Sequence, residues 1–142
     1  MEKVEDGMCE MKFHATDATK MLASVDRIVE AGNEVHFGKG EFGSYIRCTR
    51  TGKTMYLKKR RGLFVLEVVF MYGNVEERGE IIIDSGAAGN VMPKDWLKDV
   101  EAQEDKDQAR FVGANGKPLG NYGVKKVMFK PQCKPTVFSG LA

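Results

Sequence analysis

A run of aliphatic residues that ends on an aspartate constrains the fold of this chain more than any other feature. Residues 81–83 are all isoleucine, and three consecutive branched residues are typical of a strand that is buried on both faces. Asp84, Ser85 and Gly86 follow directly, and these residue types favour a sharp turn of the backbone. The pattern predicts a carboxylate that a rigid strand holds in place. It also leaves open an ordinary turn, in which the Asp84 side chain only bonds its own backbone.

The residues after this turn are small and then apolar. Residues 87–89 are Ala, Ala and Gly, which let another chain pack closely, and residues 91–93 resume an apolar strand. The whole stretch, IIIDSGAAGNVMPKDW, resembles the active-site loop of retropepsin-like aspartic proteases, particularly those encoded in retrotransposon polyproteins. The resemblance implies a mainly β, acid-protease-like (retropepsin) β-barrel domain with one short amphipathic helix.

Aspartic protease chemistry needs two carboxylates within hydrogen-bond reach of one water molecule. The pair shares a proton, because like charges so close together cannot both ionise easily. In the family, one aspartate activates the water as general base, and the protonated one polarises the scissile carbonyl. This chain has one such triplet, so the resemblance implies a symmetric homodimer with one Asp84 from each subunit.

The resemblance also implies roles for the neighbours of Asp84. Ser85 would bond across the two loops, and Gly86 would permit the tight turn, with Ala87 as a further support of the loop. The substrate would be an extended peptide or polyprotein segment, taken up by strand-like pairing.

A second glycine-rich stretch follows, with the sequence FVGANGKPLGNYGVKKVMF. Asn-Gly strongly favours a hairpin turn, because both residues adopt positive φ readily. In the family, the corresponding hairpin is the flap that closes over the bound peptide, and glycines let it open and shut. The resemblance assigns this role to the small residues of the hairpin: Ala114, Asn115, Gly116, Gly120 and Gly123.

The first part of the chain resembles the opposite end of the same family. Residues 9–15 alternate as a strand, residues 16 and 17 give a helix-start signal, and apolar residues recur at helical spacing from Met21 to Val29. The segment KMLASVDRIVEAGNEVHF is similar to the strand, short helix and final strand near the C-terminus of these proteases. In the family, however, that segment comes after the Asp-Ser-Gly loop and the flap, so the order of the two parts is permuted here.

Two explanations of the permuted order are open. The chain is a circular permutant, in which residues 71–79 are long enough to join the old termini, or it spans the end of one protease copy and the start of the next. In both cases we expect a single domain at residues 9–130, with a family C-terminal-like part at 9–70 and a family N-terminal-like part at 80–130. The polar start, residues 1–8, is expected to be disordered and residues 131–142 to form an irregular tail.

The remaining segments predict local structure rather than function. Residues 94–97 are expected to form a helical turn with Trp96 partly in the core, and residues 99–107 an exposed acidic loop. The basic run at residues 58–61 is either a solvated hairpin tip or a nuclear-import or RNA contact. Between residues 38 and 70 we expect a meander with strands at 44–48, 54–58 and 63–70.

Two glycine motifs in this meander do not carry their usual function. Gly38, Gly40 and Gly43 match the dinucleotide fingerprint, but the strand expected after them offers no helix N-terminus to a phosphate. The same stretch, followed by Lys58, is similar to the glycine loop and lysine of a protein kinase, whose catalytic and metal-binding motifs the chain lacks.

Composition points to an ordinary globular domain. The 142 residues carry a net charge of +2 with the two signs interspersed, which argues against nucleic acid and membrane as partners. No apolar run approaches the roughly 18 residues of a membrane helix, and the start lacks a secretory core, so we expect an intracellular, cytoplasmic location. Cys9, Cys48 and Cys133 are widely spaced and odd in number, which indicates reduced thiols and predicts no metal site and no cofactor.

The sequence thus leads us to expect a retrotransposon-derived aspartic endopeptidase, in which a pair of Asp84 carboxylates in a homodimer activates water. The alternative from another class is a catalytically inactive retroelement-derived relic that acts as a peptide-binding or self-association module. It stays open because the order of the segments is altered and because function resides in a site rather than in a fold.

Overall fold

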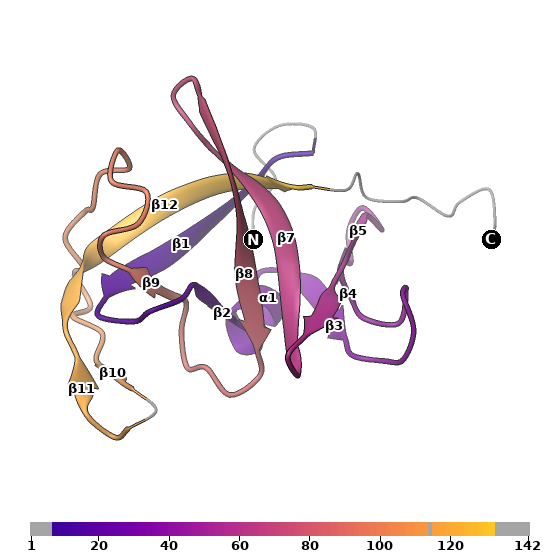
Figure 1. Ribbon diagram of the computed structural model, residues 1–142, viewed down its shortest axis with the longest axis horizontal. Helices are drawn as coiled ribbons and strands as arrows, with labels where there is room; N and C mark the ends of the chain where they lie inside the picture. The colour runs from indigo at the N-terminus through magenta and orange to yellow at the C-terminus, as the bar shows by residue number, and fades with distance from the viewer. Residues whose placement is uncertain (1–6, 114, 133–142) are drawn as a thin grey trace.

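The computed structural model describes residues 7–113 and 115–132, and this part of the chain is mainly β-structure with one short helix (Figure 1). The strands are β1 (Cys9–Thr16), β2 (Leu22–Ser24), β3 (Asn33–His36), β4 (Tyr45–Cys48), β5 (Thr54–Tyr56), β6 (Lys58–Arg60), β7 (Leu63–Tyr72), β8 (Val75–Asp84), β9 (Val91–Pro93), β10 (Phe111–Val112), β11 (Pro118–Leu119) and β12 (Asn121–Pro131), and the helix is α1 (Val25–Glu30). No helical segment in the described ranges has the length and apolarity needed to cross a bilayer.

Six of these strands close into a barrel. Their order is β12-β1-β9-β2-β8-β7, and β12 pairs with β7 to complete the ring, while β6 extends the edge of β7. The pairs β1–β9 and β2–β8 are parallel, and the other neighbours are antiparallel. The expectation of a β-barrel with one short helix is therefore confirmed at the level of architecture.

Both parts of the chain supply the barrel core. Phe13 of β1 and Phe129 of β12 are fully buried, and so is Ile81 of β8. The 9–70 part and the 80–130 part contact each other directly, because β2 pairs with β8 and β1 pairs with β12. Burial of large aliphatic and aromatic side chains from both parts makes one hydrophobic core.

The segment at residues 71–79, which is long enough to join the old termini of a circular permutant, belongs to a hairpin. Residues 71–79 form the outer half of the β7–β8 hairpin, in which Tyr72 pairs with Val75 around Gly73 at φ 58°. Figure 1 shows this hairpin projecting from the top of the barrel. The hairpin connects the 9–70 part of the chain to the 80–130 part. Along the chain, α1 leads to β7 through the small sheet β3-β4-β5 and through β6.

The helix is shorter than its apolar spacing predicted. It begins at Val25, and the residues from Leu22 to Ser24 form a strand that pairs with β8 on one side and with β9 on the other. Ser24 caps the helix, because its hydroxyl accepts the Arg27 N–H at 3.4 Å. Thr16, expected at a helix start, instead accepts the Ala18 N–H at 3.0 Å in a turn.

Smaller differences concern strand ends and turns. The strand expected at 54–58 is interrupted at the buried Leu57, where the chain leaves the β3-β4-β5 sheet and joins β7 as β6. Residues 94–97 form turns instead of a helical turn, with Leu97 buried at φ 52° and Trp96 42% exposed. Strand β12 includes Pro131, which was assigned to the tail. Residues 1–6 and 133–142 of the expected disordered ends lie outside the described residues.

Candidate active site

Asp84 is the last residue of β8 and lies at one end of the barrel. Ile81, Ile82 and Ile83 are buried, so the strand that presents the carboxylate is anchored in the core, as expected from the sequence. On its flank, β2 runs parallel to β8 and places Ser24 beside Asp84 in the register. Asp84 itself is half-buried.

Asp84 itself accepts the hydrogen bonds that stabilise the turn after it. The Gly86 N–H donates to Asp84 Oδ1 at 2.8 Å, and the Ala87 N–H donates to the Asp84 carbonyl at 3.4 Å. This is the Asx-type turn that the sequence left open, and it leaves Oδ2 available. Within the described part of the chain, the Asp84 carboxylate has no further hydrogen bond or ion pair.

Ser85 and Gly86 are both exposed, so the loop presents its small residues to solvent. The turn does not require glycine at position 86. Its φ lies outside the left-handed region, and an added Cβ would meet only Asp84 Oδ1, at an ordinary 3.4 Å. A need for glycine here must come from a partner that packs against the loop.

Asn90 fixes the far end of the loop and was not identified from the sequence. Its Oδ1 accepts the Ser24 N–H at 2.8 Å, and its Nδ2 donates to the Lys12 carbonyl at 3.0 Å. Its backbone carbonyl accepts the His14 N–H at 2.9 Å. One amide residue thus ties the Asp84 loop to both β1 and β2. No local sequence signal indicates this role, because Ser24 and Lys12 lie far from Asn90 along the chain.

The glycine-rich hairpin lies beside the Asp84 loop. A Cβ at the buried Gly89 would come within 3.1 Å of the Phe111 ring, so β10 packs directly on the loop. The Gly113 N–H donates to the Lys117 carbonyl at 2.8 Å, and Gly116 takes φ 79° in the turn. Asn115 is exposed there, and Ala114 lies outside the described residues. In Figure 1 the β10–β11 hairpin and the loop after β8 both project below the barrel.

The base of this hairpin is held by a cluster around Asp17 that sequence reasoning missed. Asp17 accepts hydrogen bonds from the Gly120 N–H (2.9 Å), the Tyr122 hydroxyl (3.0 Å) and the Lys94 ammonium (3.0 Å). The Gly120 N–H and the Lys94 ammonium hold the pKa of Asp17 below its ordinary value of 3.8. A Cβ at Gly120 would lie 2.8 Å from the Asp17 carboxylate, so this side chain would have to shift.

Gly123 and Asp105 link the acidic loop to β12. Gly123 takes φ 112° and approaches the Gln103 carbonyl so closely that a Cβ would lie 2.6 Å away. Asp105 accepts the Asn121 amide at 2.8 Å, and this hydrogen bond is the main cause that lowers the Asp105 pKa. His14 Nδ1 is 3.2 Å from Asp105 Oδ2, at an angle that does not make a hydrogen bond. The loop at residues 99–107, which was predicted only to be exposed, is therefore held to β12 through Asp105.

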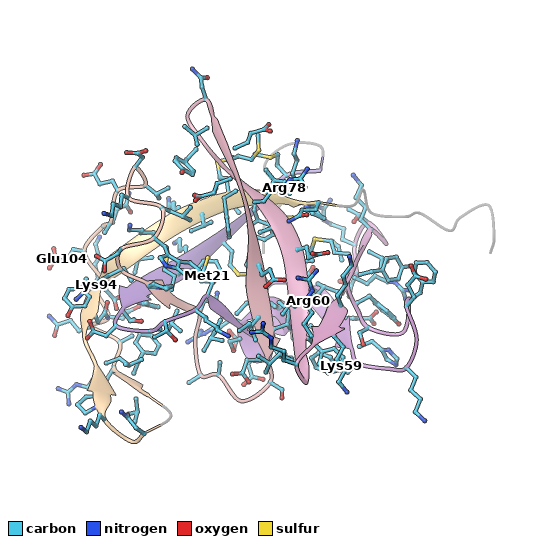
Figure 2. The ribbon with its side chains drawn as sticks, viewed as in Figure 1. Met21, Lys59, Arg60, Arg78, Lys94 and Glu104 are labelled. Atoms are coloured by element: carbon cyan, nitrogen blue, oxygen red, sulfur yellow. The ribbon has the colours of Figure 1, made fainter. Side chains whose placement is uncertain are left out.

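One groove in the described part of the chain does not include Asp84 in its lining. It has a volume of about 860 Å³ and lies on the face where Figure 2 labels Met21, Arg60 and Arg78. Arg60 is not a free cation there, because it forms ion pairs with Glu67 and Glu80.

A second hollow, of about 450 Å³, is lined by Cys9, Cys48 and Met55. The Cys48 thiol accepts hydrogen bonds from the Thr51 hydroxyl and backbone, which lower its pKa from the ordinary 9.0. No group of three or more His, Cys, Asp or Glu side chains that could hold a metal ion occurs in residues 7–113 and 115–132.

Comparison with protein-family models, with curated proteins and with solved structures finds no match to this chain. The resemblance to retropepsin-like proteases therefore depends on the sequence segments quoted above.

Proposed function

We propose that this protein is an aspartic endopeptidase whose active site forms when two copies bring their Asp84 carboxylates together. The observation that carries the proposal is the placement of Asp84. It ends a strand anchored in the core, lies half-buried at the barrel rim, and keeps one carboxylate oxygen without a partner among the described residues.

Hydrolysis needs a second carboxylate, which a single chain does not supply at this rim. In a symmetric dimer, the exposed Ser85 and Gly86 of the two copies would face each other, and their two aspartates would share one water and one proton. One aspartate then takes a proton from the water as it attacks the peptide carbonyl, and the other donates a hydrogen bond to the carbonyl oxygen.

The β10–β11 hairpin would serve as the cover of this site. It contacts the Asp84 loop through Phe111 and Gly89, and its turn is exposed, with Val112 67% exposed. An extended peptide could pair with an exposed strand edge beneath it. Closure of such a hairpin would exclude water from the reacting carbonyl.

The packing of the two chain parts supports the circular-permutant explanation. Cys9 at the start of β1 pairs with Phe129 near the end of β12, so a short loop there would restore the order of the family. The part that resembles the family C-terminus then completes the barrel within the same chain, through the β2–β8 pair.

Substitution Asp84→Asn tests the proposal directly. The variant keeps the shape of the side chain and an oxygen that can accept the Gly86 N–H, so it should fold with an unchanged far-UV spectrum and thermal midpoint. It cannot share a titratable proton, so cleavage of a peptide library at mildly acidic pH should fall by at least about 10³-fold. Asp107→Asn, at an exposed loop position, is the matched control. Equal cleavage by wild type and Asp84→Asn would remove the assignment.

The alternative is a catalytically inactive, retroelement-derived relic that binds peptides or self-associates. The observation that favours it is the groove of about 860 Å³, whose lining does not include Asp84 and which could hold a peptide without hydrolysis. Absence of cleavage by the wild-type dimer, together with peptide binding that Asp84→Asn does not alter, would select this alternative.

A further inference from the structure

The hollow of about 450 Å³ brings together sulfur atoms from three strands. Cys9 of β1, Cys48 of β4 and Met55 of β5 all line it. The Cys9 Sγ lies 4.0 Å from the Met55 Sδ. Two metal–sulfur bonds of about 2.3 Å that meet at a trigonal angle separate their sulfur atoms by about 4.0 Å. The separation observed here therefore suits two ligands of one three-coordinate metal ion.

Cys48 faces the same hollow because of its register in the β3-β4-β5 sheet. Ile46 pairs with Met55, and the Cys48 N–H donates to the Lys53 carbonyl at 2.9 Å, so the pairing continues by two residues. Residues two apart on a strand share a face, which makes Cys48 and Met55 diagonal neighbours on one face. The third sulfur thus lies on the same face as Met55 and lines the same hollow as Cys9. Met8 adds a further thioether to this lining.

The surroundings of Cys48 favour a thiolate, which is the form that binds metal ions. The Thr51 hydroxyl and N–H donate to the sulfur and hold the Cys48 pKa below the ordinary 9.0. Arg50 and Lys53 also line the hollow. A monovalent metal ion bound by two thiolates leaves a net charge of −1, which these basic residues would stabilise.

We infer that Cys9, Cys48 and Met55 bind a soft monovalent metal ion, Cu(I). Thiolate and thioether sulfur atoms are the ligands that this ion prefers. Zn(II) takes four ligands from Cys, His, Asp and Glu, and no group of three or more such side chains that could hold a metal ion occurs in the described ranges. Each thiol loses its proton on binding, so one Cu(I) and two thiols give one complex and two released protons.

Spacing along the sequence did not indicate this site, because its ligands come from separate strands and meet only through the fold. The lining of the hollow does not include Asp84. The inference is therefore independent of the proposed hydrolysis, and Asp84→Asn should bind Cu(I) as wild type does.

Titration with Cu(I), supplied as its acetonitrile complex in the absence of oxygen, tests the inference on the full chain. A Cys133→Ser background leaves Cys9 and Cys48 as the two cysteines. We expect one equivalent to bind in competition with a chelator of known affinity and to produce a thiolate-to-metal absorption band in the ultraviolet. Binding should tighten as pH rises, because protons are released. Zn(II) should compete poorly.

Three variants test the ligands. Cys9→Ser and Cys48→Ser should each weaken Cu(I) binding by at least about 100-fold, since even changes next to a ligand cost about 10- to 100-fold. Met55→Leu keeps an apolar side chain of similar volume and should weaken binding by about tenfold. The matched control is Met71→Leu, at a half-buried position of β7 outside the hollow, which should change binding by less than about twofold. Far-UV spectra and thermal midpoints check that each variant folds.

Protection from alkylation gives a readout that needs no change of a ligand. Cu(I) should shield both Cys9 and Cys48 from iodoacetamide, which mass spectrometry of their peptides measures. The inference is overturned if Cu(I) does not bind, if only one of the two thiols is shielded, or if either serine variant binds as the background does. It is also overturned if Met71→Leu weakens binding as much as Met55→Leu, if Zn(II) binds as tightly, or if half an equivalent binds and joins two chains.

Discussion

Asn90 shows how much of the candidate site depends on single residues. The sequence separates it from Ser24 by 66 positions and from Lys12 by 78, yet its side chain bonds the backbone of both. Asp17 and Tyr122 are separated by 105 positions. A polar side chain whose partners are so distant has no local signature, so neither Asn90 nor Asp17 could be predicted. Asp84 could be predicted, because its strand and its turn are neighbours in the chain.

Gly86 allows a sharp prediction at the residue scale. Gly86→Ala should leave the single chain folded, because a Cβ at this position has ordinary van der Waals room. If two copies pack loop against loop, the added methyl group should weaken dimerisation and abolish cleavage. Sedimentation velocity measures the first effect and peptide cleavage the second.

A matched control for this substitution is available on the hairpin. Gly116→Ala also adds one methyl group, but at φ 79°, where the strain acts within the chain rather than between chains. It should lower the thermal midpoint without changing the dimerisation constant at temperatures where the chain is folded. A dimer of Gly86→Ala as stable and as active as wild type would contradict close packing at this loop.

At the scale of elements, the sequence predicted strands better than helix ends. Residues 21–29 have helical spacing, yet Leu22–Ser24 form a strand because β8 and β9 supply hydrogen-bond partners on both sides. Such long-range pairing overrides a local preference and leaves no trace in the spacing itself. The β10–β11 hairpin was predicted, because its turn residues are adjacent, whereas the Asp17 cluster that holds its base was not.

The Asp17 cluster should make the hairpin insensitive to mild acid. The Asp17 pKa lies below 3.8, so the contribution of the carboxylate is present above the unfolded-state pKa and is lost only as pH falls through the lower folded value. The Lys94 pKa is raised above 10.5 by Asp17, so its contribution is present below that pH and is lost as pH rises through the folded value. The hairpin base should therefore stay attached at the mildly acidic pH where a carboxylate pair would work.

Asp17→Asn tests this behaviour by hydrogen exchange. The amide cannot form the ion pair with Lys94, so backbone exchange at residues 119–122 should become faster at pH 5, with little change in the barrel strands. Asp107→Asn, whose side chain is exposed, should leave exchange at these residues unchanged. If the two variants exchange alike, the cluster does not hold the hairpin.

For the molecule as a whole, the barrel makes the two parts of the chain one folding unit. Phe129 is fully buried between β1 and β7, whose strands come from the other part. Phe129→Ala should therefore destabilise the protein by about 3–5 kcal/mol. The substitution should lower the unfolding midpoints of both parts together. Val112→Ala, at an exposed position, should have little effect on either midpoint.

Two local probes can check that unfolding is shared. Trp96 is the only tryptophan and reports on the 80–130 part by its fluorescence. A dye on Cys48, in a variant whose other two cysteines are serine, reports on the 9–70 part. Coincident denaturant transitions are expected for wild type and for Phe129→Ala. Two separate midpoints would mean that the parts fold independently, as two incomplete protease halves would.

Pairing between distant strands is the feature of the whole molecule that the sequence could not predict. Local segments predicted the Asp84 loop and the hairpin, while the closure of β12 on β7 and the β2–β8 pair depend on contacts across the chain.

A mixing experiment tests the shared Asp84 site most directly. Wild type and Asp84→Asn are combined in equal amounts, allowed to exchange subunits, and assayed for peptide cleavage at constant total protein. If both aspartates are needed, only wild-type homodimers are active, and random pairing predicts about a quarter of the activity of pure wild type. Activity of about half, the value for chains that act singly, would contradict a site built from two copies of Asp84.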